Sequence, residues 1–240
     1  MSACRLGVLA FGDSITNGGG ELQWGVALQS WALWVARALE LPYSPFAVDG
    51  ARIGDVLERQ LPAVPAGARY DVGCLYIGVN DVRGLDWDRP AFERGHRAAL
   101  GFLNERCERV LTLTVPLDLG RPRAGAKVAE VNAAIEASAR DAGALVVDLR
   151  EFRARNLVMA DHVHPTAFGQ IAIAERALAV LARDGLPTRV RPSALIAYET
   201  TRWRRLRGDL TYLYRHSKVS ARAAGDRLRA ARSGTARTCR

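Results

Sequence analysis

The chain has 240 residues and a formal net charge of +9 at pH 7, with 49% hydrophobic and 25% charged residues. This composition excludes a disordered chain, and the length is enough for one sizeable core with an extension. No apolar run approaches the roughly 18 residues of a membrane span, and the N-terminal run breaks at Gly12 too early for a signal peptide, so we expect a cytoplasmic protein. The four cysteines are too dispersed for a secreted disulfide scaffold and are expected to be core thiols: Cys4, Cys74, Cys107 and Cys239.

The positive charge is concentrated at the C-terminal end of the chain. Residues 187–240 hold 14 Lys and Arg against three Asp and Glu, whereas residues 1–186 hold 20 against 22. The sequence pI of about 10.0 therefore describes the tail and says nothing about the remainder. We predict a folded domain over 1–186 and a basic, helical extension over 187–240.

Continuous apolar segments predict five buried strands, at residues 6–11, 45–48, 72–77, 110–115 and 144–147. Such runs suit parallel strands that are covered on both faces, whereas a half-exposed sheet would show alternating polar and apolar residues. Helical patterns lie between and after them, at residues 24–39, 53–60, 90–106, 125–141 and 166–183. The alternation of strand and helix predicts an α/β fold with a doubly wound parallel sheet.

Polar residues and glycines follow three of these strands directly. Ser14 comes after the first strand in "RLGVLAFGDSITNGGG", and Asn80 after the third in "CLYIGVNDVRG". Gly50 and Gly54 follow the second strand in "FAVDGARIGD". Because ligand sites form at the carboxyl ends of parallel strands, these loops are expected to converge on one edge of the sheet.

A serine hydroxyl becomes a useful nucleophile only when an oriented base removes its proton. The segment "MADHVHPTAFGQ" supplies Asp161 and His164 within one loop, close enough for the carboxylate to receive the imidazole Nδ1 proton. His162 competes for this role, but Pro165 restricts the backbone of His164, and the i, i+3 spacing of Asp161 and His164 suits the pairing better. Two histidines without a further His or Cys cluster do not predict a metal site.

An acyl-transfer site also needs donors for a developing oxyanion. The Ser14 N–H, a glycine N–H after the second strand and the Asn80 side-chain amide can supply three donors from three loops. The chain contains no G-x-S-x-G motif, which argues against the α/β-hydrolase fold.

These blocks, in this order over residues 5 to about 185, resemble those of the SGNH/GDSL hydrolase family: Gly12-Asp13-Ser14, a glycine after the second strand, Gly78-Val79-Asn80-Asp81, and Asp161-His162-Val163-His164. The resemblance implies a flavodoxin-like three-layer α/β/α sandwich with a five-stranded parallel sheet. It also implies a nucleophile at Ser14, a base at His164, an orienting carboxylate at Asp161 and oxyanion donors at Ser14, Asn80 and a glycine.

The second block departs from the family pattern of an asparagine followed by a serine-glycine pair. Asp49 stands where the asparagine would be, and Ile53-Gly54 where the serine-glycine would be. This register makes Gly54 the donor, with Gly50 as the alternative.

The expected function is that of a serine esterase that hydrolyses acyl esters through an acyl-Ser14 intermediate, without metal or organic cofactor. Two alternatives stay open: an acyltransferase that moves the acyl group to a sugar or lipid hydroxyl, and a catalytically silent module that binds a membrane surface. Asp13 and Trp87 are candidates for substrate contact. The substrate pocket is expected to come from the loops at residues 16–24, 82–90 and 117–125.

The basic tail carries an apolar stripe, because Trp203, Leu206, Leu210 and Leu213 recur at spacings of three and four with arginines between them. This pattern predicts an amphipathic helix. Its stripe could dock on the rest of the protein or on another subunit, the helix could adhere to an anionic membrane surface, or, less favoured, it could contact nucleic acid.

Overall fold

The structure, a computed structural model, describes residues 5–120, 124–198 and 201–235. Its centre is one five-stranded sheet in the order β2-β1-β3-β4-β5, in which every neighbouring pair is parallel. The strands are β1 (Val8–Gly12), β2 (Tyr43–Pro45), β3 (Tyr70–Tyr76), β4 (Cys107–Leu113) and β5 (Leu145–Val147). Five expected strands are present within a few residues of their predicted bounds, and the predicted fold class is confirmed.

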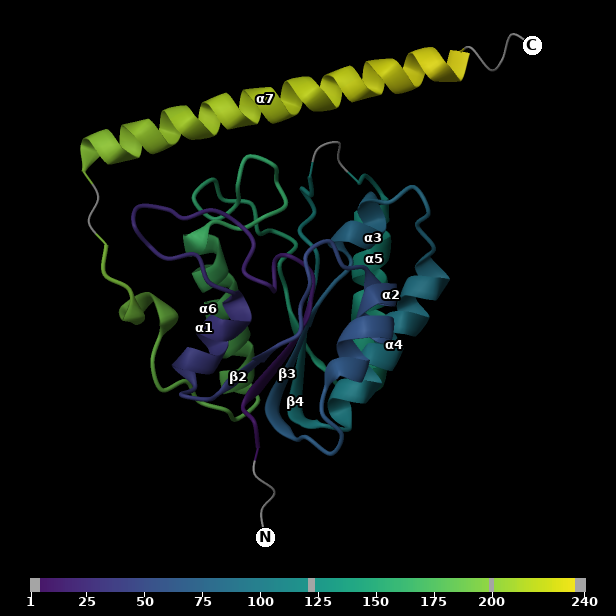
Figure 1. The fold of residues 1–240 in the computed structure, drawn as a ribbon, viewed down its shortest axis with the longest axis vertical. Helices are drawn as coiled ribbons and strands as arrows, with labels where there is room; N and C mark the ends of the chain where they lie inside the picture. Colours follow the sequence, from purple (N-terminus) through teal and green to yellow (C-terminus); the bar gives the residue numbers. More distant parts are fainter. Residues whose placement is uncertain (1–4, 121–123, 199–200, 236–240) are drawn as a thin grey trace.

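Helices cover both faces of the sheet (Figure 1). On one face lie α1 (Trp31–Ala38) and α6 (Ala167–Arg183), and on the other lie α4 (Arg89–Asn104) and α5 (Lys127–Ala142). The shorter elements are α2 (Ile53–Asp55), a π-helical turn (Val56–Gln60), a 3-10 turn (Leu61–Ala63), α3 (Val79–Arg83) and a 3-10 turn (Pro192–Leu195). The strands are buried from both sides, which explains their continuous apolar sequences.

The first long helix begins later than its sequence pattern predicts. Residues 24 and 25 form a turn, residues 27–30 have no regular secondary structure, and α1 begins at Trp31 with the Ser30 side chain accepting a hydrogen bond from the Ala32 N–H. Trp24 and Gly25 both have positive φ angles, of 50° and 83°, which a right-handed helix does not allow. The predicted helix at 24–39 is therefore wrong over its first seven residues.

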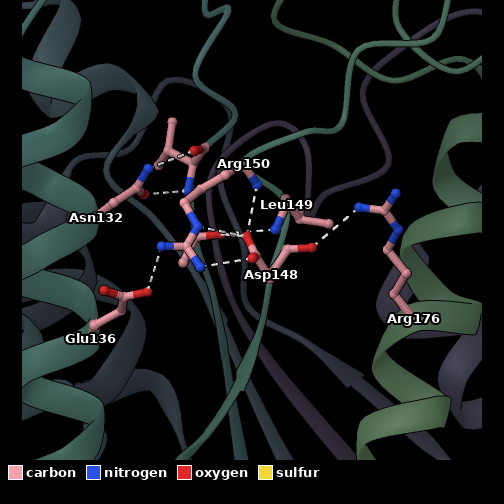
Figure 2. Close-up of polar contacts among 8 residues, drawn as sticks. Asn132, Glu136, Asp148, Leu149, Arg150 and Arg176 are labelled. Atoms are coloured by element: carbon pink, nitrogen blue, oxygen red, sulfur yellow. Dashed lines mark hydrogen bonds and ion pairs between the residues drawn. The ribbon is translucent and has the colours of Figure 1, made fainter.

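The ends of β4 and β5 are held to helices on both faces of the sheet (Figure 2). The Asp148 carboxylate, directly after β5, accepts bonds from the Arg150 Nη2 at 2.8 Å and Nε at 3.0 Å, and these bonds lower the pKa of Asp148 to about 2. Arg150 also pairs with Glu136 of α5, while Arg176 of α6 donates to the Asp148 carbonyl. The loops that follow these strands thus start from fixed points.

Helix α7 (Arg202–Thr235) lies outside the three layers, across the edge at which the strands end (Figure 1). Among the described residues, no helix combines the length and apolar character that a membrane crossing requires. Cys74 is buried and Cys107 half-buried, both as free thiols, while Cys4 and Cys239 lie outside the described residues.

Candidate active site

The turn that carries Ser14 begins at Gly12, the last residue of β1. Gly12 has a φ of 149°, and a Cβ atom there would lie 2.3 Å from the Tyr76 carbonyl oxygen of β3. No other residue fits this position without moving the sheet. The Asp13 carboxylate then accepts the Ile15 N–H at 2.9 Å, which closes the turn and leaves Ser14 half-buried at the sheet edge.

Asp13 is completely buried, which does not fit the substrate contact expected of it. Burial raises the pKa of its carboxyl to about 7, against hydrogen bonding to Ile15 and attraction to His164, which lower it. Asp13 therefore holds the turn through Ile15, and its fully buried carboxylate is closed to a ligand.

The Gly12 backbone is held by a buried glutamine that sequence analysis did not single out. Gln60 accepts the Gly12 N–H through Oε1 at 2.9 Å and donates through Nε2 to the Gly12 carbonyl at 2.8 Å. It is 2% exposed and ends the π-helical turn that interrupts the helix predicted at 53–60. The available signal was a glutamine in helical phase with the buried residues Ile53 and Val56.

The structure brings Ser14, His164 and Asp161 into one hydrogen-bonded line. The Ser14 Oγ lies 2.9 Å from His164 Nε2, and His164 Nδ1 lies 2.7 Å from Asp161 Oδ2. The other oxygen of Asp161 accepts the N–H groups of Val163 and His164 at 2.9 and 3.1 Å. His164 stands just before α6, whose first turn is capped by the Thr166 hydroxyl. A serine in this setting can lose its proton to the imidazole.

The pKa values of Asp161 and His164 are shifted in the directions that favour proton transfer from Ser14 to His164. The hydrogen bond that His164 donates to Asp161 raises the pKa of His164 above its ordinary value of 6.5, although partial burial opposes this. Burial also works against the ionised form of Asp161, but its bonds to His164 and two backbone N–H groups hold its pKa below the ordinary value. An ionised Asp161 thus stabilises an imidazolium at His164.

His162, the alternative base, points to a different partner. Its Nδ1 lies 3.0 Å from Asp118 Oδ2, and its backbone adopts a left-handed φ of 61°. His164 is thus the histidine whose ring the structure places against Ser14.

The loops after β2 and β3 are tied to each other beside this line. Asn80, in the first turn of α3, donates its side-chain N–H to the Ala51 carbonyl at 3.0 Å, and an amide NH₂ retains a second hydrogen. Asp81 accepts the Ile53 N–H at 3.1 Å, and burial raises the pKa of Asp81 to about 6. These two contacts connect the segment that holds Gly54 with the segment that holds Asn80.

The two glycines after β2 differ in their surroundings. Gly54 occupies the second position of α2, where an α-helix leaves its N–H groups without an intrahelical partner. Gly50 has a φ of 76° and lies earlier, in the turn that leads from β2 to α2. The Gly54 N–H is therefore the better candidate for a donor to a bound anion.

A cavity of about 290 Å³ opens beside Gly54. Trp87 lines it, with its ring packed on Phe92 at a centroid distance of 5.4 Å and its Nε1 donating to Glu130 at 2.8 Å. Residues of the loop at 82–90 thus line a cavity, and Ser14 and His164 are not among the residues that line it. The loop at 117–125 includes residues 121–123, which lie outside the described residues. The cavity wall is rich in carboxylates: Asp55, Glu58, Asp81, Asp86 and Asp88.

Comparison with solved structures shows a shared fold. The chain is similar to LAE5, an alpha/beta hydrolase enzyme from the metagenome of Lake Arreo, with 20% identity, a TM-score of 0.59 and coverage of 73% of this chain and 94% of that one. It is also similar to Axe2, an acetylxylan esterase from Geobacillus stearothermophilus, with 20% identity and a TM-score of 0.57. That match covers 74% of this chain and 96% of Axe2. An extracellular lipase from Streptomyces rimosus has 23% identity and a TM-score of 0.55. That match covers 73% of this chain and 98% of the lipase.

No curated protein matches the chain. The model of the GDSL-like Lipase/Acylhydrolase family, however, matches residues 10–171, which include Ser14, Asn80, Asp161 and His164. Because this match extends over more than half of its length, the chain belongs to the GDSL-like lipase/acylhydrolase family.

Proposed function

We propose that the protein is a serine esterase that cleaves acyl esters through a covalent acyl-Ser14 intermediate. The observation that carries the proposal is the unbroken hydrogen-bonded line from the Ser14 Oγ through His164 to Asp161. His164 Nε2 removes the hydroxyl proton as Oγ attacks the ester carbonyl, and Asp161 stabilises the imidazolium that results. No metal or organic cofactor takes part in these steps.

The tetrahedral oxyanion is held by three donors in this proposal: the N–H groups of Ser14 and Gly54 and the second amide hydrogen of Asn80. The contact of Asn80 with Ala51 supports its role, because it fixes the amide plane before substrate arrives. His164 then gives its proton to the leaving alcohol oxygen. In the second half of the cycle His164 takes a proton from water, which attacks the acyl-Ser14 carbonyl and releases the carboxylic acid.

We propose that part of the substrate lies in the carboxylate-rich cavity beside Gly54, which favours small or polar substrates. A long alkyl chain lying there would desolvate several carboxylates without giving them a partner, which costs free energy. We therefore propose short acyl groups on hydroxyl-bearing alcohols, with Trp87 at the cavity wall. The acetylxylan esterase named above acts on an ester of this kind.

The first prediction concerns turnover of p-nitrophenyl esters from acetate to palmitate. The wild type is expected to hydrolyse the shorter esters best, and Ser14→Ala is expected to lower kcat by at least about 10³-fold. The matched control is Ser217→Ala on the exposed face of α7, which should leave kcat unchanged. An inactive wild type that becomes active only when an alcohol acceptor is added would show an acyltransferase instead.

The second prediction concerns the pH dependence of kcat/KM. Only neutral His164 accepts the Ser14 proton, so activity should rise with pH through an inflection above 6.5, because Asp161 raises the pKa of His164. Asp161→Asn should move the inflection to lower pH and decrease kcat by about 10³- to 10⁴-fold. Asp118→Asn, which removes the carboxylate that contacts His162, should leave the inflection in place. An inflection that moves with Asp118 and not with Asp161 would make His162 the base.

The third prediction identifies Gln60 as a positioning residue. Gln60→Leu removes both bonds to Gly12 and frees the turn that places Ser14, so kcat should fall by about 10- to 100-fold with little change in KM. Asn132→Leu is the matched control, since this buried side chain holds both backbone groups of Val115, two residues after β4, in the same way.

Both of these variants should lose about 1 to 3 kcal/mol of unfolding free energy, measured by denaturant titration. Only Gln60→Leu should lose kcat under conditions where both are folded. Equal losses of kcat in the two variants would show that Gln60 contributes to stability alone.

A further inference from the structure

Helix α7 turns a defined face toward the rest of the protein. Asp209 pairs with Arg155, whose guanidinium also lies over the Tyr212 ring at 5.2 Å, and the rings of His216 and His162 lie 5.6 Å apart. These α7 residues and Ala223, which is only 4% exposed, recur at helical spacing on one side of the helix. The inner face is thus a polar and aromatic one, held by charged contacts.

The apolar stripe of α7 lies on the opposite side, in solvent. Trp203 is 79% exposed and Leu210 59% exposed, and the remaining stripe residues are comparably open: Leu206, Leu213, Tyr214 and Leu228. Leu228 comes about four helical turns after Leu213 and returns to the same side, with small residues on that side between them. The sequence left open that the stripe docks on the rest of the protein. In the described residues the stripe does not, because its side chains lie in solvent.

Basic residues border this exposed stripe. Between Arg202 and Arg229 the helix has nine Lys and Arg against two Asp. Arg207, Lys218 and Arg222 fall on one side of the helix, next to the stripe, and all three are exposed. Residues 1–186 are nearly neutral, so an anionic surface would be attracted to α7 in particular.

We propose that α7 binds the surface of an anionic lipid membrane through this outward face. A helix that lies in the plane of a membrane interface needs an apolar stripe that enters the acyl boundary and flanking arginines or lysines that reach the phosphates. The outward face has both, and its Trp203 is of the amphipathic aromatic type favoured at that depth.

Two other occupants fit these observations less well. Nucleic acid would contact the basic residues but would leave the leucines and Trp203 in water. A second copy of α7 would cover the stripe, but it would bring two strongly positive helices side by side. An anionic membrane is the one surface that satisfies the stripe and the charge together.

The location of α7 gives this binding a functional consequence, which rests on the proposed esterase function. The helix lies across the edge of the sheet at which Ser14 stands (Figure 1), and Arg215 of α7 pairs with Glu21 in the loop that follows Ser14. A membrane bound to the outward face would therefore hold the active-site edge close to the lipid surface.

The test is co-sedimentation of the full chain with vesicles of phosphatidylcholine alone or with about 30% phosphatidylserine. We expect binding to the anionic vesicles at least tenfold tighter, weakened by salt, and a blue shift of tryptophan emission that Trp203→Phe removes. Ser14→Ala should bind as well as the wild type, so failure of the esterase proposal and failure of this one are separable.

Matched triple variants separate the two parts of the surface. Binding to anionic vesicles should weaken on the order of 100-fold in each of two triple variants. One removes the apolar stripe (Leu206→Gln/Leu210→Gln/Leu213→Gln), and the other removes flanking charges (Arg207→Gln/Lys218→Gln/Arg222→Gln). Vesicle binding should not weaken in two control variants at exposed positions outside α7. These are the single variant Leu195→Gln and the triple variant Arg94→Gln/Arg140→Gln/Arg153→Gln. Circular dichroism should show the wild-type helical content for all of them.

Three results would overturn the proposal. The first is that the wild type binds neutral and anionic vesicles equally, or binds neither. The second is that it binds RNA in place of vesicles. The third is that it binds no vesicles but forms a concentration-dependent dimer that the leucine variant abolishes.

Discussion

The close approach of the Gly12 backbone to β3 is the constraint on which the candidate site depends. A side chain at this position would meet the Tyr76 carbonyl, so β1 can end here, and the chain can turn, only with a glycine. Gln60 then saturates both backbone groups of Gly12 from a segment 48 residues further along the chain. The position of Ser14 is thus set by packing and hydrogen bonds on its own strand and on two neighbouring elements.

The parallel sheet does the remaining positioning. Because all five strands end at one edge, residues 150 positions apart in sequence, Ser14 and His164, come within hydrogen-bonding distance. Asp161 uses both of its oxygens, one for the imidazole and one for the backbone N–H groups of its own loop, so its orientation is fixed before a substrate binds. The buried Asp81 extends this pattern by joining the loops after β2 and β3. Preorganised groups of this kind stabilise developing charge without reorganisation.

Much of this architecture could be predicted from local sequence patterns, because continuous apolar runs report burial on both faces and the polar residues after them report the sheet edge. The start of α1 could not, since Ser30 caps the helix and positive φ angles at Trp24 and Gly25 end a pattern that looks helical in sequence. Gln60 could not either, because its partner Gly12 is brought to it only by the folded sheet. For α7, the periodicity predicted a helix, but which side faces the protein depends on contacts such as Arg155 with Asp209.

The central claim is that His164 and Asp161 make Ser14 a nucleophile, and covalent labelling with a fluorophosphonate tests it most directly. We expect a single adduct on the wild-type chain, located at Ser14 by peptide mass spectrometry, and strongly slowed labelling of His164→Ala although that variant retains the serine. A folded wild-type protein that is not labelled, or that is labelled at another residue, would contradict it.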